Sequence, residues 1–172
     1  LYAPKAFGIT ALFLSLTTIL GAIACMRYEL SIVLSDDDSE AANLLGVSLL
    51  FTLIITFCTV LIIWFGSTFI LEWINVVELA PYLWLIPIGV LFQGLFTAFN
   101  YWNTRTKHFT RLSIANISKQ IANTTGTLGA GFSGYATGGS MIIANIGSQV
   151  IATIVLAVQI LRDNSKFLLK SI

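Results

Sequence analysis

The sequence predicts an all-α integral membrane protein with five transmembrane helices. Hydrophobic residues make up 56% of its 172 residues, charged residues make up only 10%, and the mean hydropathy is +0.88. Ordinary globular proteins have about 25% charged residues, so a soluble fold of this length could not cover its surface with polar groups. Long uncharged runs separate the charged clusters, and a bilayer is the solvent that suits such runs.

Four uncharged runs define the expected helices. Three of them are each long enough for one spanning helix, and they cover residues 6–26, 41–71 and 79–104. The fourth run, residues 120–161, is long enough for two helices, and its glycine-rich middle predicts a tight turn near residues 134–139. We therefore expect a single transmembrane fragment, 1–172, with helices over 7–33, 42–70, 80–103, 112–133 and 138–161.

The basic residues alternate between the two sides of the predicted bundle. They are Arg27 after the first helix, Arg105, Lys107, His108 and Arg111 after the third, and the C-terminal tail. The segment after the second helix carries only acids, and the turn after the fourth is uncharged. Because cytoplasmic loops accumulate Lys and Arg, we expect the basic loops and the tail in the cytoplasm. This alternation requires five helices.

Polar residues, all uncharged except one lysine, recur at steps of three and four in four of these helices, which places each set on one face. The sets are Ser48, Thr52, Thr56 and Thr59; Gln93, Thr97, Asn100 and Thr104; Asn116, Lys119, Gln120, Asn123 and Thr127; and Asn145, Ser148 and Gln149. Polar groups facing lipid are costly, so these faces should turn inward. They would either hydrogen-bond across packed helices, for about 0.6–2 kcal/mol each, or line a water-filled cavity for a polar substrate.

Lys119 is the residue on which these two interpretations differ most. It lies about seven residues into its predicted helix, or roughly 10 Å at 1.5 Å per residue, and a charge at mid-membrane costs about 3 kcal/mol or more. Its long stem could snorkel to the interface, or a cavity that receives an anionic headgroup could hold it. The candidate substrate-binding residues are Lys119, Asn116, Gln120, Asn123, Gln93, Asn100, Asn145 and Gln149.

Each candidate motif of an enzyme or of a metal site in this sequence lacks a required partner residue, so neither an enzyme nor a cofactor is expected. Residues 129–134 match G-x-G-x-x-G, but they follow no strand and no acid lies about 20 residues on. Ser133 lies among glycines, but the only histidine, His108, is expected on the opposite side of the membrane, too far to act as its base. Cys25 and Cys58 lie in apolar runs without a metal-ligand partner. A net charge of +1 does not indicate nucleic-acid binding.

Three segments resemble the loops of bacterial lipid-linked oligosaccharide flippases. They are LYAPKAFG at the start, RYELSIVLSDDDSEAANLLGVSLL from Arg27, and NYWNTRTKHFTRLSIANI from Asn100. The most specific parts are the cytoplasmic loop motif Arg27, Tyr28 and Glu29 and the pair Tyr101 and Trp102. These flippases, which handle polysaccharide precursors such as O-antigen, belong to the multidrug/oligosaccharidyl-lipid/polysaccharide exporter superfamily.

The resemblance implies a transporter of two six-helix bundles in the bacterial inner membrane. A central cavity would open alternately to each side, and the substrate would be a glycan linked to polyprenyl pyrophosphate. This chain would hold helices two to six of the first bundle. Its partners would be the lipid-linked oligosaccharide, membrane lipids and the missing second bundle of the same protein. Lys119 as a pyrophosphate contact follows from its depth and not from the resemblance.

Two other functions remain open at this point. A multidrug or cation antiporter of the same superfamily would usually need an acid inside the membrane, and none of the five predicted helices holds one at mid-span. A membrane scaffold or assembly protein without transport would use the polar faces for packing only. In that case, cysteines placed along these faces would not react with polar reagents from the aqueous side.

Overall fold

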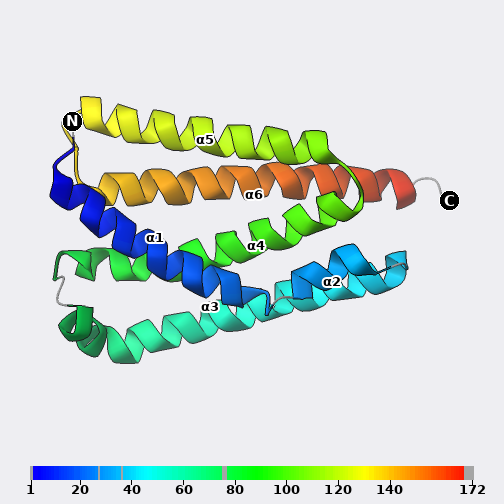
Figure 1. Ribbon diagram of the computed structural model, residues 1–172, viewed down its shortest axis with the longest axis horizontal. Coiled ribbons are helices and arrows are strands. Elements are labelled where there is room, and N and C mark those ends of the chain that lie inside the picture. Colours follow the sequence, from blue (N-terminus) through cyan, green and yellow to red (C-terminus); the bar gives the residue numbers. More distant parts are fainter. Residues whose placement is uncertain (1, 27, 36, 75–76, 169–172) are drawn as a thin grey trace.

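The computed structural model describes residues 2–26, 28–35, 37–74 and 77–168, and the surroundings of their side chains except at 67–78, 161 and 163–168. Within these residues the chain forms helices joined by short turns (Figure 1). The elements are α1 (Pro4–Ala24), α2 (Tyr28–Leu34), α3 (Asp38–Ile74), the 3₁₀ helix η1 (Val77–Leu85), α4 (Ile86–Arg105), α5 (Phe109–Phe132) and α6 (Gly138–Leu168).

Four helical segments in the described part of the chain are long and apolar enough to cross a membrane. They are Pro4–Ala24, Asp38–Gly66, Leu79–Arg105 and Gly138–Ile160. The predicted fifth span, 112–133, is present as α5, whose 24 residues extend about 36 Å. It does not meet the same standard of hydropathy, because Asn, Gln, Lys and Thr recur along it. By length and composition, four of the described helices could therefore span a membrane, and a fifth span stays a prediction.

The first predicted helix, 7–33, is in fact two helices. α1 ends at Ala24 and α2 begins at Tyr28, and between them Met26 has a φ of 50°. This break lets α2 pack against both α3 and α4. Residues 25–28 contain neither glycine nor proline, the usual signals of a break, so the apolar pattern alone predicted one continuous helix.

The third predicted helix, 80–103, also begins differently from the prediction. Its first turns belong to the 3₁₀ helix η1, and the α-helix starts only at Ile86. Pro81 and Pro87 have no backbone N–H to donate, which weakens α-helical hydrogen bonding through this segment. The helices predicted over 42–70, 112–133 and 138–161 correspond to α3, α5 and α6, although α3 and α6 are longer than predicted.

Two local motifs mark helix ends, and the second confirms the predicted turn. At the start of α3, the hydroxyl and the N–H of Ser39 donate to the Asp37 carboxylate at 2.7 and 3.2 Å. These bonds cap the helix and hold the pKa of Asp37 below its ordinary value. At the end of α5, Gly134 has a φ of 84°, and the N–H of Tyr135 donates to the carbonyl of Ala130 at 3.0 Å. This glycine-based stop makes the predicted turn before α6.

The charged loops meet at one end of the bundle. Arg105 Nη1 lies 2.5 Å from Asp38 Oδ1, and the same guanidinium donates to the carbonyl of Ser35 at 3.2 and 3.4 Å. The C-terminal end of α6 lies at this end as well, whereas the N-terminus and the α5–α6 turn lie at the other (Figure 1). This arrangement agrees with the alternation of loops that the charges predicted.

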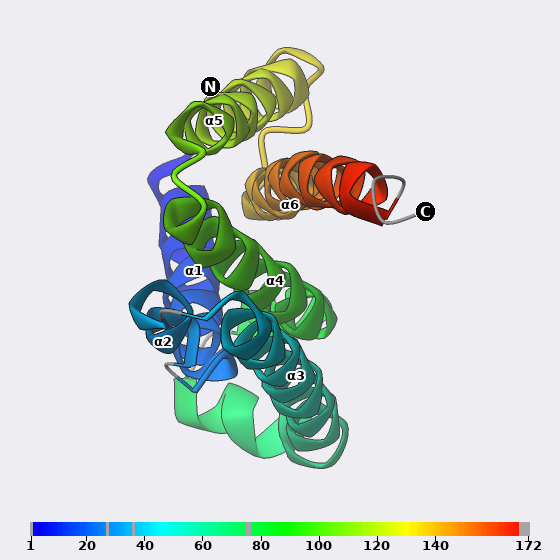
Figure 2. The same ribbon diagram turned by 90° about the vertical axis from the view of Figure 1, so that its right-hand side faces the viewer.

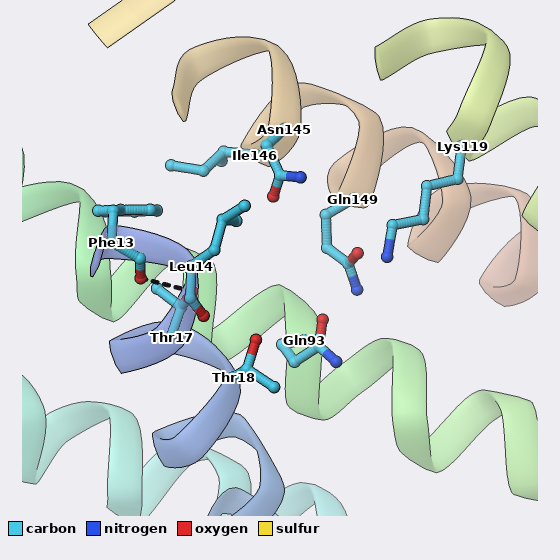
Figure 3. Close-up of a pocket in the computed structure, with 10 residues that line it drawn as sticks. Phe13, Leu14, Thr17, Thr18, Gln93, Lys119, Asn145, Ile146 and Gln149 are labelled. Carbon is cyan, nitrogen blue, oxygen red and sulfur yellow. Dashed lines mark hydrogen bonds between the residues drawn. The ribbon is translucent and has the colours of Figure 1, made fainter. Parts of the chain in front are cut away.

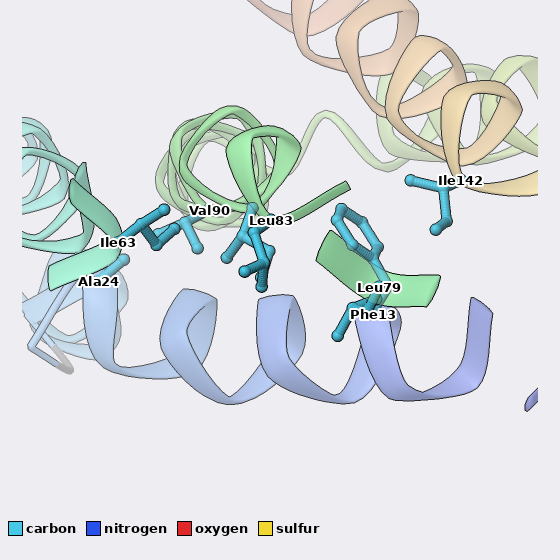
Figure 4. Packing of buried hydrophobic residues seen from close by; sticks show 8 residues of the cluster. Phe13, Ala24, Ile63, Leu79, Leu83, Val90 and Ile142 are labelled. Atoms are coloured by element: carbon cyan, nitrogen blue, oxygen red, sulfur yellow. The ribbon is translucent and has the colours of Figure 1, made fainter. Parts of the chain in front are cut away.

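Two apolar clusters hold the helices together on either side of α4. The first joins α1, α3, η1, α4 and α6 through the buried side chains Phe13, Ile63, Leu79, Leu83, Val90 and Ile142 (Figure 4). The second joins α4, α5 and α6 through Phe96, Ala115, Ala152 and Leu156. Viewed along the bundle, α5 and α6 lie on one side of α4, and α2 and α3 on the other (Figure 2).

Gly94 allows α3 and α4 to cross closely. A Cβ at this position would lie 2.5 Å from Thr52 Cγ2 and 3.3 Å from Ala24 Cβ. Thr52 is fully buried, and its hydroxyl donates to the carbonyl of Ser48 at 2.8 Å, so it has little freedom to move. Small residues at helix crossings are typical of membrane proteins, where close packing drives association.

Gly94→Ala is therefore expected to destabilise the full-length protein in detergent by about 1–3 kcal/mol, the usual cost of overpacking. Adding Thr52→Ser to this variant removes the methyl group nearest to the new Cβ but keeps the hydroxyl oxygen at 2.9 Å, so it should recover part of this loss. Gly8→Ala is the matched control, because a Cβ there meets nothing within 4 Å. Thermal unfolding of all four proteins measures the effect. A shift for Gly94→Ala no larger than that for Gly8→Ala would contradict the close crossing.

Candidate functional site

A cavity of about 210 Å³ lies among α1, α4, α5 and α6. Its polar lining comes from all four helices: Thr17 and Thr18 from α1, Gln93 from α4, Lys119 from α5, and Asn145 and Gln149 from α6 (Figure 3). Phe13, Leu14, Gly89 and Ile146 complete the wall. The cavity thus combines several hydrogen-bonding groups with one charged group, and no carboxylate is among the residues that line it.

Four of the eight predicted residues meet in this one cavity. They are Gln93, Lys119, Asn145 and Gln149, and they come from three different helices. Prediction missed Thr17 and Thr18, which α1 contributes to the opposite wall. Thr10 and Thr17 are seven residues apart and both are buried, so the same polar spacing was present in α1.

Lys119 lies deeper than the sequence indicated. α5 begins at Phe109, so Lys119 is ten residues from its start, or about 15 Å along a helix of about 36 Å. That places it close to the middle of the helix. Its side chain extends from α5 toward the amide groups of Gln149 and Gln93 (Figure 3). Its ammonium lies 5.1 Å from the centroid of the Phe96 ring, the contact that a cation makes with an aromatic face.

Hydrogen bonds between α6 and α4 stabilise the floor of the cavity. Gln149 Nε2 and the hydroxyl of Thr153 both donate to the carbonyl of Phe92, at 3.5 and 3.3 Å. The Phe92 carbonyl is part of the α4 backbone, and it accepts these two bonds from α6 while α4 stays helical. Gln149 is thereby oriented beside Lys119 while its amide remains part of the cavity wall.

The other predicted residues lie elsewhere on the helices. Asn116 and Gln120 are exposed and Asn123 is half-buried, and none of the three lines the cavity. Asn100 is half-buried and lies two turns beyond Gln93, toward the charged end of α4. The reason is geometric. Successive residues on a helix are about 100° apart, so the polar stripe of α5 is too wide for all of its residues to face one neighbouring helix. Among the predicted α5 residues, only Lys119 lines the cavity.

The stripe on α3 serves helix packing. Ser48, Thr52 and Thr59 are buried, and the hydroxyls of Thr52 and Thr59 each donate at 2.8 Å to a carbonyl one turn earlier in α3. Thr52 and Thr59 therefore satisfy their hydroxyl groups within α3, whereas the hydroxyl oxygens of Ser48 and Thr56 are buried without a hydrogen-bond partner among the described residues. The packing interpretation holds for this stripe, whereas the stripes on α4, α5 and α6 contribute to the cavity.

The loop motif is partly within the described structure. Arg27 lies outside the described residues, so an ion pair between Arg27 and Glu29 stays a prediction. The ring of Tyr28 stacks on that of Phe51, with centroids 5.5 Å apart and planes at 4°. Glu29 is only 4% exposed, and its Oε2 has no hydrogen-bond partner in the described part of the chain. Both residues thus belong to the first turn of α2, where Glu29 is buried and Tyr28 stays exposed beside Phe51.

Comparison with known proteins identifies one family. The sequence pattern of a family described as "Polysaccharide biosynthesis protein" matches residues 1–166. No curated protein and no solved structure matches the chain. The match covers every element that builds the cavity, from α1 through most of α6.

Asn145→Cys is expected to react with a charged, membrane-impermeant thiol reagent, because thiolates form only where water reaches the sulfur. The background is the full-length protein with Cys25→Ser and Cys58→Ala. Ile143→Cys, two residues away on α6 and 61% exposed on the outer surface of the bundle, should face lipid and not react. Labelling is measured by mass spectrometry. Equal lack of reaction at both positions would show that the polar residues pack in a dry interface.

Proposed function

The chain belongs to the polysaccharide biosynthesis protein family, and we propose on this basis that it is part of a flippase that moves a polyprenyl-pyrophosphate-linked glycan across the bacterial inner membrane. The observation that carries the proposal is the polar cavity that holds Lys119. Its wall offers hydroxyls and carboxamides, which suit sugar hydroxyls, and a single ammonium, which suits a phosphate oxygen. The role is transport, and no covalent chemistry is required of these residues.

The charge of Lys119 is what fits this cavity to an anionic headgroup. No carboxylate lines the cavity, so the charge of the ammonium is not neutralised by its neighbours there. In a medium of low dielectric constant, a phosphate group would interact with it far more strongly than in water. Charge-assisted hydrogen bonds between ammonium and phosphate are also about twice as strong as neutral ones.

The proposal treats α5 as a fifth membrane-crossing helix. α5 packs mainly along α6, which is long and apolar enough to cross the membrane. If α6 spans the membrane, α5 runs beside it over its whole length. The polar residues of α5 would then need to face water instead of lipid. A second bundle opposite the cavity would supply that surface and complete a two-bundle transporter, in which alternating access arises when one half rocks against the other.

The two alternative functions make different demands on the same residues. A cation antiporter would usually need an acid at the substrate site. The acids among the described side chains are Glu29 in α2 and three residues at the start of α3, Asp37, Asp38 and Glu40, and none of them lines the cavity. A scaffold requires packing alone, which does not account for a lysine placed halfway along α5 in an open cavity. The flippase accounts for both observations.

Lys119→Ala in the full-length protein is expected to impair glycan export. Loss of a hydrogen bond to a charged group costs about 1.5–3 kcal/mol, which corresponds to affinity for the headgroup that is about 10- to 100-fold weaker. Surface polysaccharide on intact cells of a deletion strain, complemented at matched protein levels, measures export. Lys119→Arg keeps the charge and should retain part of the activity.

The control for this experiment removes a lysine from the loop. Lys107 is exposed and has a φ of 57°, so Lys107→Asn removes the charge and keeps a residue that tolerates this backbone conformation. It should export normally. Wild-type polysaccharide in the Lys119→Ala strain would contradict the proposed role of the cavity.

The orientation of the chain is tested separately. In the cysteine-free background, a cysteine at Lys107 should be protected from an impermeant thiol reagent in intact cells, because the positive-inside rule places the basic end in the cytoplasm. A cysteine at Tyr135, in the exposed turn at the opposite end, should react. The reverse pattern would invert the proposed orientation, and reaction at both positions would show that the ends do not lie on opposite sides.

A further inference from the structure

The ammonium of Lys119 lies over the ring of Phe96, 5.1 Å from the ring centroid. Phe96 is 9% exposed and packs in the cluster with Ala115, Ala152 and Leu156. Ala115 lies one turn before Lys119 on α5, so the ring fills the space beneath the lysine between α4, α5 and α6. Since Ala115 and Ala152 are fully buried and small, they leave the ring room and hold it in place.

Phe96 does not line the cavity. A ligand in the cavity would therefore touch Lys119 and not the ring, and any effect of the ring on the ligand must pass through the lysine. This separates Phe96 from the residues of the proposed binding site. It also distinguishes it from Gln93 and Gln149, whose amides face the cavity directly.

An aromatic ring and a carboxylate would influence the lysine in different ways. Both attract an ammonium, but a carboxylate neutralises its charge, whereas the negative face of a ring attracts it and adds no net charge. A lysine side chain is also long and flexible and loses rotamer freedom when it is fixed. A ring that orders the ammonium in the empty cavity reduces the entropy that an arriving anion must remove, while the full positive charge stays available.

We propose that Phe96 is a positioning residue, whose ring face holds the Lys119 ammonium in place to receive a phosphate-bearing anion. The inference rests on the proposed function and deepens it, because it assigns the selectivity of the cavity for phosphate anions to a pair of residues. Lys119 supplies the charge and Phe96 supplies its placement. A purely structural Phe96 would fill the same volume without any dependence on the electrons of its ring.

The experiment varies the ring's electrons at nearly constant shape. Phe96 in the full-length protein is replaced by mono-, di- and trifluorinated phenylalanine, which progressively weaken the negative ring face. Binding of inorganic pyrophosphate to the protein in lipid nanodiscs is measured by calorimetry. We expect stepwise weaker binding along the series, about 3- to 10-fold in total, the range that an exposed to partly buried cation–π contact supports.

The matched control is the same series at Phe99. Phe99 lies on the same helix and packs against the same cluster, with no cation–π contact among the described side chains. Fluorination there should leave the affinity unchanged. An affinity that is the same across the Phe96 series, or that changes equally in the Phe99 series, would overturn the positioning role.

Lys119→Ala in the same assay separates the two levels of the argument. If it loses pyrophosphate binding and the Phe96 series is flat, the positioning role fails and the proposed function stands. If Lys119→Ala binds pyrophosphate like the wild type, the proposed role of the cavity fails, and the inference fails with it. The expected result is loss of binding on Lys119→Ala, with fluorination of Phe96 having no further effect in that variant.

Discussion

The hydrocarbon core of a bilayer offers no partner for a polar side chain, and the arrangement of this bundle follows from that constraint. The chain meets it in two ways. The hydroxyls of Thr52 and Thr59 on α3 donate to carbonyls of their own helix, so they can be buried between helices without a second partner. Four larger polar groups, Gln93 of α4, Lys119 of α5, and Asn145 and Gln149 of α6, meet two threonines of α1 around one cavity.

α4 is the helix that separates these two environments. On one side, Gly94 brings it against Thr52 of α3, and this close crossing is dry and tightly packed. On the other side, Gln93 lines the cavity and Phe96 packs beneath Lys119. Gln93, Gly94 and Phe96 lie within four positions of α4. Because neighbouring positions on a helix point about 100° apart, the three face different surroundings. A change in the rotation of α4 would alter the close crossing and the cavity together.

The distribution of charge connects the fold to the family. The strongly charged loops meet at one end, where Arg105 joins the start of α3 to the end of α4, while the turn at the other end carries no charge. Lys119 lies between the two ends, about 15 Å from the start of α5. An isolated positive charge at that depth is costly for a protein that only needs to pack its helices. This charge is the feature on which the proposed binding of an anionic headgroup depends.

The sequence by itself determined the helical class, four of the membrane-crossing segments, the turn at Gly134 and the alternation of loops, because runs without charge and glycine conformations are local properties. It also identified Lys119, Gln93, Asn145 and Gln149 as polar groups that should face inward. Only the tertiary structure decided that these four share a cavity with Thr17 and Thr18, that Asn116 and Gln120 do not, and that α1 stops at Ala24 so that α2 can pack on α3 and α4. The rotation of each helix about its axis depends on packing against its neighbours, and a single helix's sequence specifies a polar face more broadly than one neighbour can cover.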